Sequence, residues 1–313
     1  METIKNVTVA GGGVLGSQIA FQTAYKGFDV TVWVRSDASI ERARPKFVHL
    51  RDAYLSMLEA MKTNPAAYCR GLAATPDLTA SEIDELKGRV TAAYEGISFT
   101  TSHEDAARDA DLVIEAIAED PAQKRAFYEA LAPHLPERTI LATNSSTLLP
   151  SQLADATVRP EKFLALHFAN EIWRNNTAEI MGHPGTSPEA YEAVVVFAEA
   201  IGMVPLRLHK EQPGYILNSM VVPFLNAAQA LYVTGVADPE TIDKTWTLAS
   251  GAPMGPFRIL DVVGLNTAYN IVKLDPQASD PDTVAGKIAA SLKEKIDAGM
   301  TGVAAGEGFY KYR

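Results

Sequence analysis

The amino-acid sequence predicts an α/β protein: a Rossmann-type doubly wound parallel sheet with an inserted helical hairpin, followed by a smaller all-α domain. Three observations predict this fold. A glycine-rich turn follows an apolar strand near the N-terminus, and short apolar strands then alternate with helical segments as far as residue 210. Beyond that residue the apolar periodicity is helical, with few strand signals.

The first strand runs straight into a G-x-G-x-x-G motif made by Gly11, Gly13 and Gly16. Gly11 permits the tight turn, Gly13 lets the backbone approach a phosphate, and Gly16 lets the following helix pack on the strand. Backbone N–H groups at a helix N-terminus bind anions. We therefore expect this motif, with Val14 and Leu15 inside it, to bind the pyrophosphate of a dinucleotide; the alternative is a turn that is merely tight.

The second strand, residues 29–34, ends where NAD-binding folds usually place an Asp or Glu against the ribose hydroxyls. This chain has Val34, Arg35 and Ser36 there. A guanidinium pairs well with a 2′-phosphate, and a serine hydroxyl adds a hydrogen bond, so the sequence favours NADP over NAD as the cofactor. The alternative is a solvated Arg35, with Asp37 reaching back to the ribose.

Residues 40–90 depart from the alternation of strands and helices, and their periodicity predicts an antiparallel helical hairpin inserted in the nucleotide domain. We expect Pro45 in a first helical turn and a second helix over residues 81–93. Apolar side chains at helical spacing predict a stripe that faces the core: Phe47, Leu50, Tyr54, Leu58 and Met61.

The remaining elements follow from short apolar runs and helical periodicity. Further strands are expected at residues 98–100, 112–116, 140–143, 163–166, 178–181 and 204–208. Further helices are expected at residues 17–26, 123–131, 188–200, 216–234, 239–249, 259–273 and 283–298. We place the domain boundary at residues 211–214, which gives an NAD(P)-binding Rossmann domain over residues 1–210 and an all-helical domain over residues 211–313.

Composition and charge exclude several classes of function. The 28 basic and 38 acidic residues give a formal net charge of −10, and no stretch concentrates lysine or arginine, so no nucleic acid partner is expected. The sequence has no run of about 18 apolar residues and no secretory signal, which predicts no membrane partner and a cytoplasmic location. Cys69 is the only cysteine, so neither an intrachain disulfide nor a multi-cysteine metal site is expected, and we predict no metal.

Polar side chains follow three predicted strands, at the edge where a doubly wound sheet binds its ligands: Glu119 and Lys124, residues 144–147, and His167. Of the six histidines, only His167 lies at the carboxyl end of a predicted buried strand. A neutral imidazole can accept the proton of a substrate alcohol as hydride leaves its carbon. Glu179, twelve residues later, is expected to hold the other ring nitrogen. From spacing alone, a structural histidine remains an equal alternative.

Together these residues resemble the short-chain L-3-hydroxyacyl-CoA dehydrogenase family, which includes 3-hydroxybutyryl-CoA dehydrogenases, over essentially the whole chain. The motifs that carry the resemblance are residues 11–16, the spacing of Glu119 and Lys124, Asn144-Ser145-Ser146, His167-Phe168-Ala169-Asn170, Glu179, Pro213-Gly214-Tyr215-Ile216-Leu217-Asn218, Pro253-Met254-Gly255-Pro256-Phe257 and Gly306-Glu307-Gly308-Phe309-Tyr310.

The resemblance implies hydride transfer between NAD(P) and C3 of a short-chain 3-hydroxyacyl-CoA, in either direction. It makes His167 the general acid/base and Glu179 its orienting partner, with Ser146 and Asn218 holding the substrate oxygen or the surroundings of the histidine. It also implies that the helical domain closes the cleft and builds a homodimer.

The resemblance further places Glu119, Lys124 and Asn144 along the nicotinamide half of the cofactor. Each has a simpler alternative. Glu119 and Lys124 could form a pair on a helix surface, and Asn144 could cap the following helix together with Ser146.

The chain departs from the family pattern at positions that face the acyl group and coenzyme A. The family's His-Phe-Phe-Asn-Pro-Pro or Pro-Val run is replaced by residues 167–172, which read His-Phe-Ala-Asn-Glu-Ile. Leu50 and Met57 stand nearest to the family's serine and lysine, and Ala304 replaces a lysine near the C-terminus. These changes weaken the expectation of a coenzyme A substrate.

Two other functions therefore stay open. The first is a dehydrogenase of a free hydroxy acid, of the gulonate or carnitine type, with Arg174 as a fork for the carboxylate. The second is a protein that binds NADPH without turnover, against which the set of Ser146, His167, Glu179 and Asn218 argues.

Overall fold

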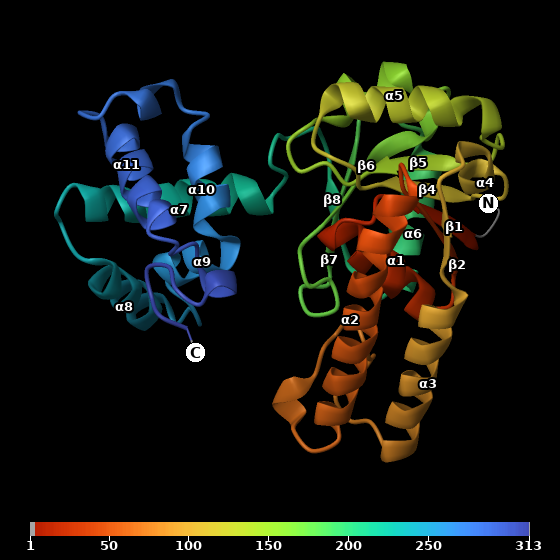
Figure 1. Ribbon diagram of the computed structural model, residues 1–313, viewed down its shortest axis with the longest axis horizontal. Helices are drawn as coiled ribbons and strands as arrows, with labels where there is room; N and C mark the ends of the chain where they lie inside the picture. The colour runs from red at the N-terminus through yellow and green to blue at the C-terminus, as the bar shows by residue number, and fades with distance from the viewer. Residues whose placement is uncertain (1–3, 313) are drawn as a thin grey trace. The chain divides into compact units, whose positions relative to one another are not determined.

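A computed structural model describes residues 4–312 and divides the chain into two compact units, Met1–Ile216 and Leu217–Arg313. The first unit is built on one eight-stranded sheet of order β3-β2-β1-β4-β5-β6-β7-β8 (Figure 1). Its strands are β1 Asn6–Ala10, β2 Asp29–Trp33, β3 Ser98–Thr100, β4 Leu112–Glu115, β5 Ile140–Thr143, β6 Phe163–Phe168, β7 Thr177–Gly182 and β8 Val204–Leu208. This arrangement confirms the predicted Rossmann-type α/β class.

The sheet is parallel except for one pair, β6 and β7, which run antiparallel. All four residues of β4, of β5 and all six of β6 are buried, as expected for strands with both faces covered by helices. Strand β1 has β2 on one side and β4 on the other, so the strand order runs outward from β1 in both directions. Doubly wound sheets bind their ligands where the strand order reverses in this way.

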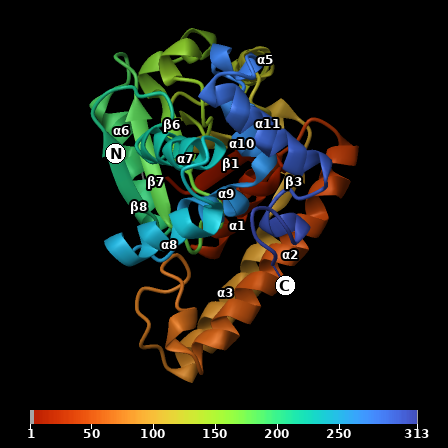
Figure 2. The same ribbon diagram turned by 90° about the vertical axis from the view of Figure 1, so that its left-hand side faces the viewer.

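The helices of the first unit are α1 Val14–Tyr25, α2 Asp37–Met61, α3 Ala80–Gly96, α4 His103–Ala107, α5 Pro121–Leu131 and α6 Pro188–Ala200. Helices α2 and α3 lie side by side and project from the sheet as the predicted hairpin (Figures 1 and 2). Short 3₁₀ turns cover Pro65–Ala67, Ala132–His134, Pro150–Gln152, Ala154–Ala156 and Pro160–Lys162.

The expected place of Pro45 in a first helical turn is wrong. Helix α2 begins at Asp37, after Ser36 in an extended conformation, so Pro45 lies inside the helix. The Ser36 hydroxyl makes no cap hydrogen bond, but its extended backbone and the acidic Asp37 in the first turn mark an earlier helix start than the proline does. Pro45 is exposed, and it removes one hydrogen bond from the helix, to the carbonyl of Glu41.

The second unit is helical, with α7 Leu217–Val233, α8 Pro239–Ser250, α9 Pro256–Val263, α10 Leu265–Val272, α11 Val284–Asp297 and 3₁₀ turns at Pro276–Ser279 and Val303–Ala305. The single helix predicted over residues 259–273 is wrong, because Gly264 adopts a φ of 90° and separates α9 from α10. The apolar periodicity continues across this break, and both helices contribute to one core around Phe257, Leu260 and Leu265. The two units divide between Ile216 and Leu217, two residues beyond the segment 211–214 in which the boundary is expected.

The glycine turn after β1 is compact because its glycines touch backbone. Gly11 has a φ of 123°, and a Cβ on it would lie 2.3 Å from the carbonyl oxygen of Ala116. A Cβ on Gly16 would lie 2.2 Å from the carbonyl oxygen of Gly11, so α1 packs directly on the turn. Only glycine fits at these two positions. No helix within residues 4–312 is long and apolar enough to cross a membrane.

Candidate active site

A cavity of about 810 Å³ opens at the glycine turn, between the ends of β1, β2 and β4. Gly11, Gly12 and Gly13 line it, and a Cβ on Gly13 would meet nothing within 4 Å. In the described part of the chain, no side chain caps the N-terminus of α1 beside the turn. Open space next to free helix N–H groups fits a dinucleotide pyrophosphate.

The end of the cavity beside β2 is basic. Arg35, Arg42 and Lys46 line it together with Ser39, whose hydroxyl lies 3.0 Å from the hydroxyl of Ser36. Arg42 Nη2 also donates to Ser39 Oγ, at 2.7 Å. Within the described chain, the residues lining this cavity include no carboxylate that could bind ribose hydroxyls.

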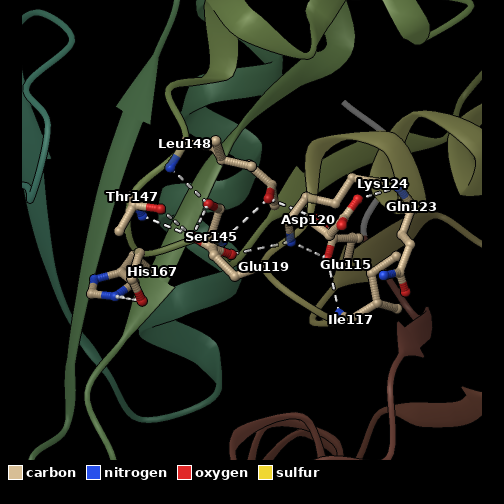
Figure 3. A network of polar contacts seen from close by, with 12 residues as sticks. Glu115, Ile117, Glu119, Asp120, Gln123, Lys124, Ser145, Thr147, Leu148 and His167 are labelled. Carbon is tan, nitrogen blue, oxygen red and sulfur yellow. Dashed lines mark hydrogen bonds and ion pairs between the residues drawn. The ribbon is translucent and has the colours of Figure 1, made fainter. Parts of the chain in front are cut away.

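A buried carboxylate, Glu115, closes the carboxyl end of β4 (Figure 3). It accepts hydrogen bonds from Lys124 Nζ at 2.6 Å, the Ile117 N–H at 2.8 Å, Tyr128 Oη at 2.9 Å and Thr143 Oγ1 at 2.8 Å. Burial, and next the Glu115 carboxylate, raise the pKa of Tyr128 well above its ordinary value, so its hydroxyl stays a donor. The cluster ties the end of β4 to α5 and to the end of β5.

Glu119 extends this network to the next loop (Figure 3). Its Oε1 accepts from Ser145 Oγ at 2.5 Å, from the Thr147 N–H at 2.9 Å and from Thr147 Oγ1 at 2.8 Å, while Lys124 Nζ lies 3.5 Å from Oε2. Partial burial alone would raise the pKa of Glu119, but these hydrogen bonds and the lysine charge hold it below its ordinary value. Glu119 is therefore a carboxylate at neutral pH.

His167 has a partner on each ring nitrogen. It lies opposite Glu179 in the register of β6 and β7, and its Nδ1 is 3.1 Å from Glu179 Oε2. Its Nε2 lies 3.2 Å from Ser146 Oγ, in the loop after β5. His167 and Glu179 are 8% and 4% exposed, so little water competes for their contact. A carboxylate beside Nδ1 favours the tautomer with the proton on Nδ1, which leaves the lone pair on Nε2.

The structure thus brings Ser146, His167 and Glu179 together as the sequence predicts. Asn144 lies beside them, with Oδ1 accepting from the Phe168 N–H at 3.1 Å, rather than as a helix cap. Lys124 is 1% exposed and its ammonium is held by Glu115, so the alternative of a surface pair with Glu119 is wrong. Asn218 is the second residue of α7, in the second unit, and its role stays a prediction.

Sequence reasoning missed three groups of residues. Glu115 carries a signal, because it is the only charge in an apolar strand of four residues. Arg42 and Lys46 carry another, since they follow Ser39 at helical spacing on one face of α2. Tyr215, which stacks on His167, lies in the motif at residues 213–218, but that motif gave no indication of its contact with the histidine. Within residues 4–312, no group of three His, Cys, Asp or Glu side chains could hold a metal ion.

This fold and site define a dehydrogenase that takes a nicotinamide dinucleotide as its hydride carrier. Residues 6–212 match the model of the 3-hydroxyacyl-CoA dehydrogenase NAD-binding domain, and residues 214–312 match that of the C-terminal domain of the same family. The chain therefore belongs to the 3-hydroxyacyl-CoA dehydrogenase family, as its motifs predict, and it is an oxidoreductase with an NAD-binding domain.

Individual relatives agree with this family. The human mitochondrial hydroxyacyl-coenzyme A dehydrogenase is 31% identical over 99% of this chain and 92% of its own length. A probable 3-hydroxybutyryl-CoA dehydrogenase of Deinococcus radiodurans is 32% identical, covering 97% of this chain and 99% of the relative. The solved structure of a diketoreductase that acts on dicarbonyl compounds is 48% identical, with a TM-score of 0.86 and 100% coverage of both chains.

Replacing Lys124 by Met should destabilise the protein by about 3–5 kcal/mol, because it leaves the Glu115 carboxylate buried without its cation. Urea denaturation monitored by circular dichroism measures this. The double variant Lys124→Met with Glu115→Gln should recover part of the loss. The matched control is Lys293→Met, which removes an exposed pair with Asp297 and should change the free energy of unfolding far less, because water already screens that pair. Equal costs for the two lysines would contradict this account of the cluster.

Proposed function

We propose that this chain transfers a hydride between its nicotinamide cofactor and C3 of a short-chain 3-hydroxyacyl-CoA, with His167 as general acid/base. The observation that carries the proposal is the imidazole bonded on both sides, to Glu179 through Nδ1 and to Ser146 through Nε2. A histidine held in one tautomer, next to a hydroxyl that can bind the same substrate oxygen, is suited to proton transfer at an alcohol.

The residues divide the chemistry between them. When bound, the nicotinamide ring accepts the hydride from C3 or returns it. In oxidation, the proton of the substrate hydroxyl moves to His167 Nε2, and the C–O bond becomes a carbonyl. Glu179 stabilises the imidazolium that forms, since its Oε2 accepts from Nδ1. Ser146 Oγ donates to the substrate oxygen, and Asn218 is proposed to hold the same oxygen.

We assign the remaining predicted residues to holding the cofactor. The turn at residues 11–16 binds the pyrophosphate. Glu119 and Asn144 lie along the nicotinamide half, and Lys124 positions Glu119 from inside the protein. This last assignment refines the expected direct contact of Lys124, because its ammonium is buried against Glu115.

A second candidate is a carrier-free substrate, either a β-dicarbonyl compound or a free 3-oxo acid. The 48% identity to a diketoreductase favours the first form, as do Leu50 and Met57 at the positions nearest the family's serine and lysine. Arg174 would serve the second form as a carboxylate fork. Its guanidinium is exposed and lies 3.8 Å from the sulfur of Met57, on the hairpin helix α2.

A substrate panel with a His167 variant tests both candidates. We expect the wild type to reduce acetoacetyl-CoA with a higher kcat/KM than acetoacetate or 2,4-pentanedione. His167→Ala should lower kcat by a factor on the order of 10² or more while leaving cofactor affinity unchanged, because only proton transfer is lost. His134→Ala, an exposed histidine, is the control. A higher kcat/KM for either carrier-free compound than for acetoacetyl-CoA would contradict the first candidate and support the second.

We further propose that the enzyme prefers NADPH. Arg35 and Arg42 line the cavity beside β2 where a 2′-phosphate would lie, and Val34 occupies the place of the usual acidic residue. Ser39 holds Arg42 in place through its hydroxyl. The structure does not favour Asp37 as a ligand of the ribose. Its side chain is exposed, and among the described residues it does not line the cavity.

Cofactor titrations in steady-state reduction should give a kcat/KM at least about tenfold higher for NADPH than for NADH, equivalent to one or two charge-assisted hydrogen bonds. Arg35→Asp should invert that ratio, because a carboxylate repels the phosphate and accepts from ribose hydroxyls. Arg44→Asp makes the same charge change on α2 outside the cavity, and should leave the ratio unchanged. A wild type that prefers NADH would refute the assignment.

We also propose that the chain forms a homodimer through its helical unit, in the cytoplasm. Large apolar side chains are exposed on that unit, among them Met220, Trp246, Leu248 and Val262. Such side chains are commonly buried in obligate interfaces. Sedimentation velocity should give twice the chain mass of 33.7 kDa, whereas a single-chain mass at micromolar concentration would contradict the proposal.

A further inference from the structure

Tyr215 makes a parallel ring contact with the proposed acid/base. Its ring centroid lies 4.3 Å from that of His167, and the two ring planes differ by 11°. The tyrosine is 1% exposed, so it shields one face of the imidazole from water. Its hydroxyl donates to the carbonyl oxygen of Ser145 at 2.6 Å. Burial, and next the Glu119 carboxylate, raise the pKa of Tyr215 well above its ordinary value, so the hydroxyl remains a donor.

The backbone at Tyr215 is held in an unusual conformation. Its φ is 55°, in the left-handed region that aromatic residues rarely adopt. The N–H of Tyr215 donates to the Gln212 carbonyl at 3.0 Å, and the next N–H, of Ile216, donates to Glu179 Oε1 at 2.9 Å. Such conformations persist where the surroundings fix them, and they cluster at functional sites.

This one residue is thereby connected to every member of the proton-transfer group in the first unit. It stacks on His167, anchors the loop of Ser146 through the Ser145 carbonyl, and directs the following N–H at Glu179. Glu179 thus receives His167 on one oxygen and Ile216 on the other. Movement of Tyr215 would disturb all three contacts together.

We propose that Tyr215 is a positioning residue for His167: its ring fixes the plane of the imidazole toward Ser146 and favours the imidazolium through its π face. A cation over an aromatic ring within about 6 Å is attracted by the ring quadrupole. An aliphatic side chain of similar size could fill the same space, but it has no quadrupole and no planar surface. The inference rests on the proposed role of His167 in catalysis.

Two variants separate the ring from the hydroxyl. Tyr215→Phe keeps the stack and loses the bond to Ser145, and we expect its kcat to stay within about threefold of the wild type. Tyr215→Leu loses the stack, and we expect kcat to fall about tenfold or more, with KM for substrate and cofactor changing less than about threefold. The pH at which the reduction rate declines should move to a lower value, because the imidazolium has lost a stabilising contact.

The matched control is Tyr25→Leu. Tyr25 is 2% exposed, donates its hydroxyl to the Leu72 carbonyl at 2.9 Å, and packs edge-on against Tyr54 rather than on a histidine. The two Leu variants remove the same atoms and the same kind of hydrogen bond. We expect Tyr25→Leu to lower the melting temperature, to leave kcat within about twofold of the wild type, and to leave the pH profile unchanged.

Imidazole NMR provides a readout that needs no substrate. Stacking places the C–H protons of His167 over the Tyr215 ring, so their signals should be shifted upfield in the wild type and Tyr215→Phe, and should return downfield in Tyr215→Leu. His167→Gln assigns these signals. No upfield shift in the wild type, or an unmoved pH profile in Tyr215→Leu, overturns the proposal. An enzyme inert toward every substrate would refute the proposed function, whereas the NMR spectra would still decide whether the two rings stack. If Tyr215→Leu fails to fold, the spectra of the wild type and Tyr215→Phe decide the same question.

Discussion

The buried ion pair of Glu115 and Lys124 is the interaction on which the rest of the site depends. A carboxylate inside a protein is tolerated only when charges and donors surround it, and Glu115 has a lysine, two hydroxyls and a backbone N–H. These donors come from α5, from β5 and from the loop after β4. Satisfying one carboxylate therefore fixes the relative places of three elements, and it puts Glu119 within reach of Ser145 and Thr147.

The antiparallel pairing of β6 and β7 supplies the second constraint. His167 and Glu179 are direct partners in the ladder, so their side chains emerge on the same face of the sheet. A register slip of one residue would turn Glu179 to the opposite face. The placement of His167 beside Glu179 is thus a consequence of strand pairing. Strand β5 pairs with β6 on the side opposite β7, and the loop after β5 brings Ser146 to His167.

Much of this could be predicted from the sequence, because the signals are local. The glycine turn, His167 at a strand end and Glu179 on the returning strand each follow from residue type and spacing. What could not be predicted depends on contacts between distant segments. Nothing near Tyr215 in the chain indicates its ring stack or its positive φ, and nothing near Lys124 shows that its partner is Glu115 rather than solvent. Pro45 and Gly264 led to wrong helix boundaries for two reasons: α2 tolerates an exposed proline in its interior, and the φ of Gly264 interrupts a helix that apolar periodicity alone would continue.

The ladder between His167 and Glu179 also bears on the order in which the site assembles during folding. These partners are twelve residues apart, so a short chain closure brings the proton-transfer pair together. The cofactor cavity needs β1 against β4, where Val7 pairs with Leu112 across about half of the first unit's sequence. Closing that longer loop costs more chain entropy, and contacts of high sequence separation form slowly. The His167–Glu179 pair is thus encoded in a local hairpin, whereas the cavity that holds the hydride carrier exists only once distant strands have met.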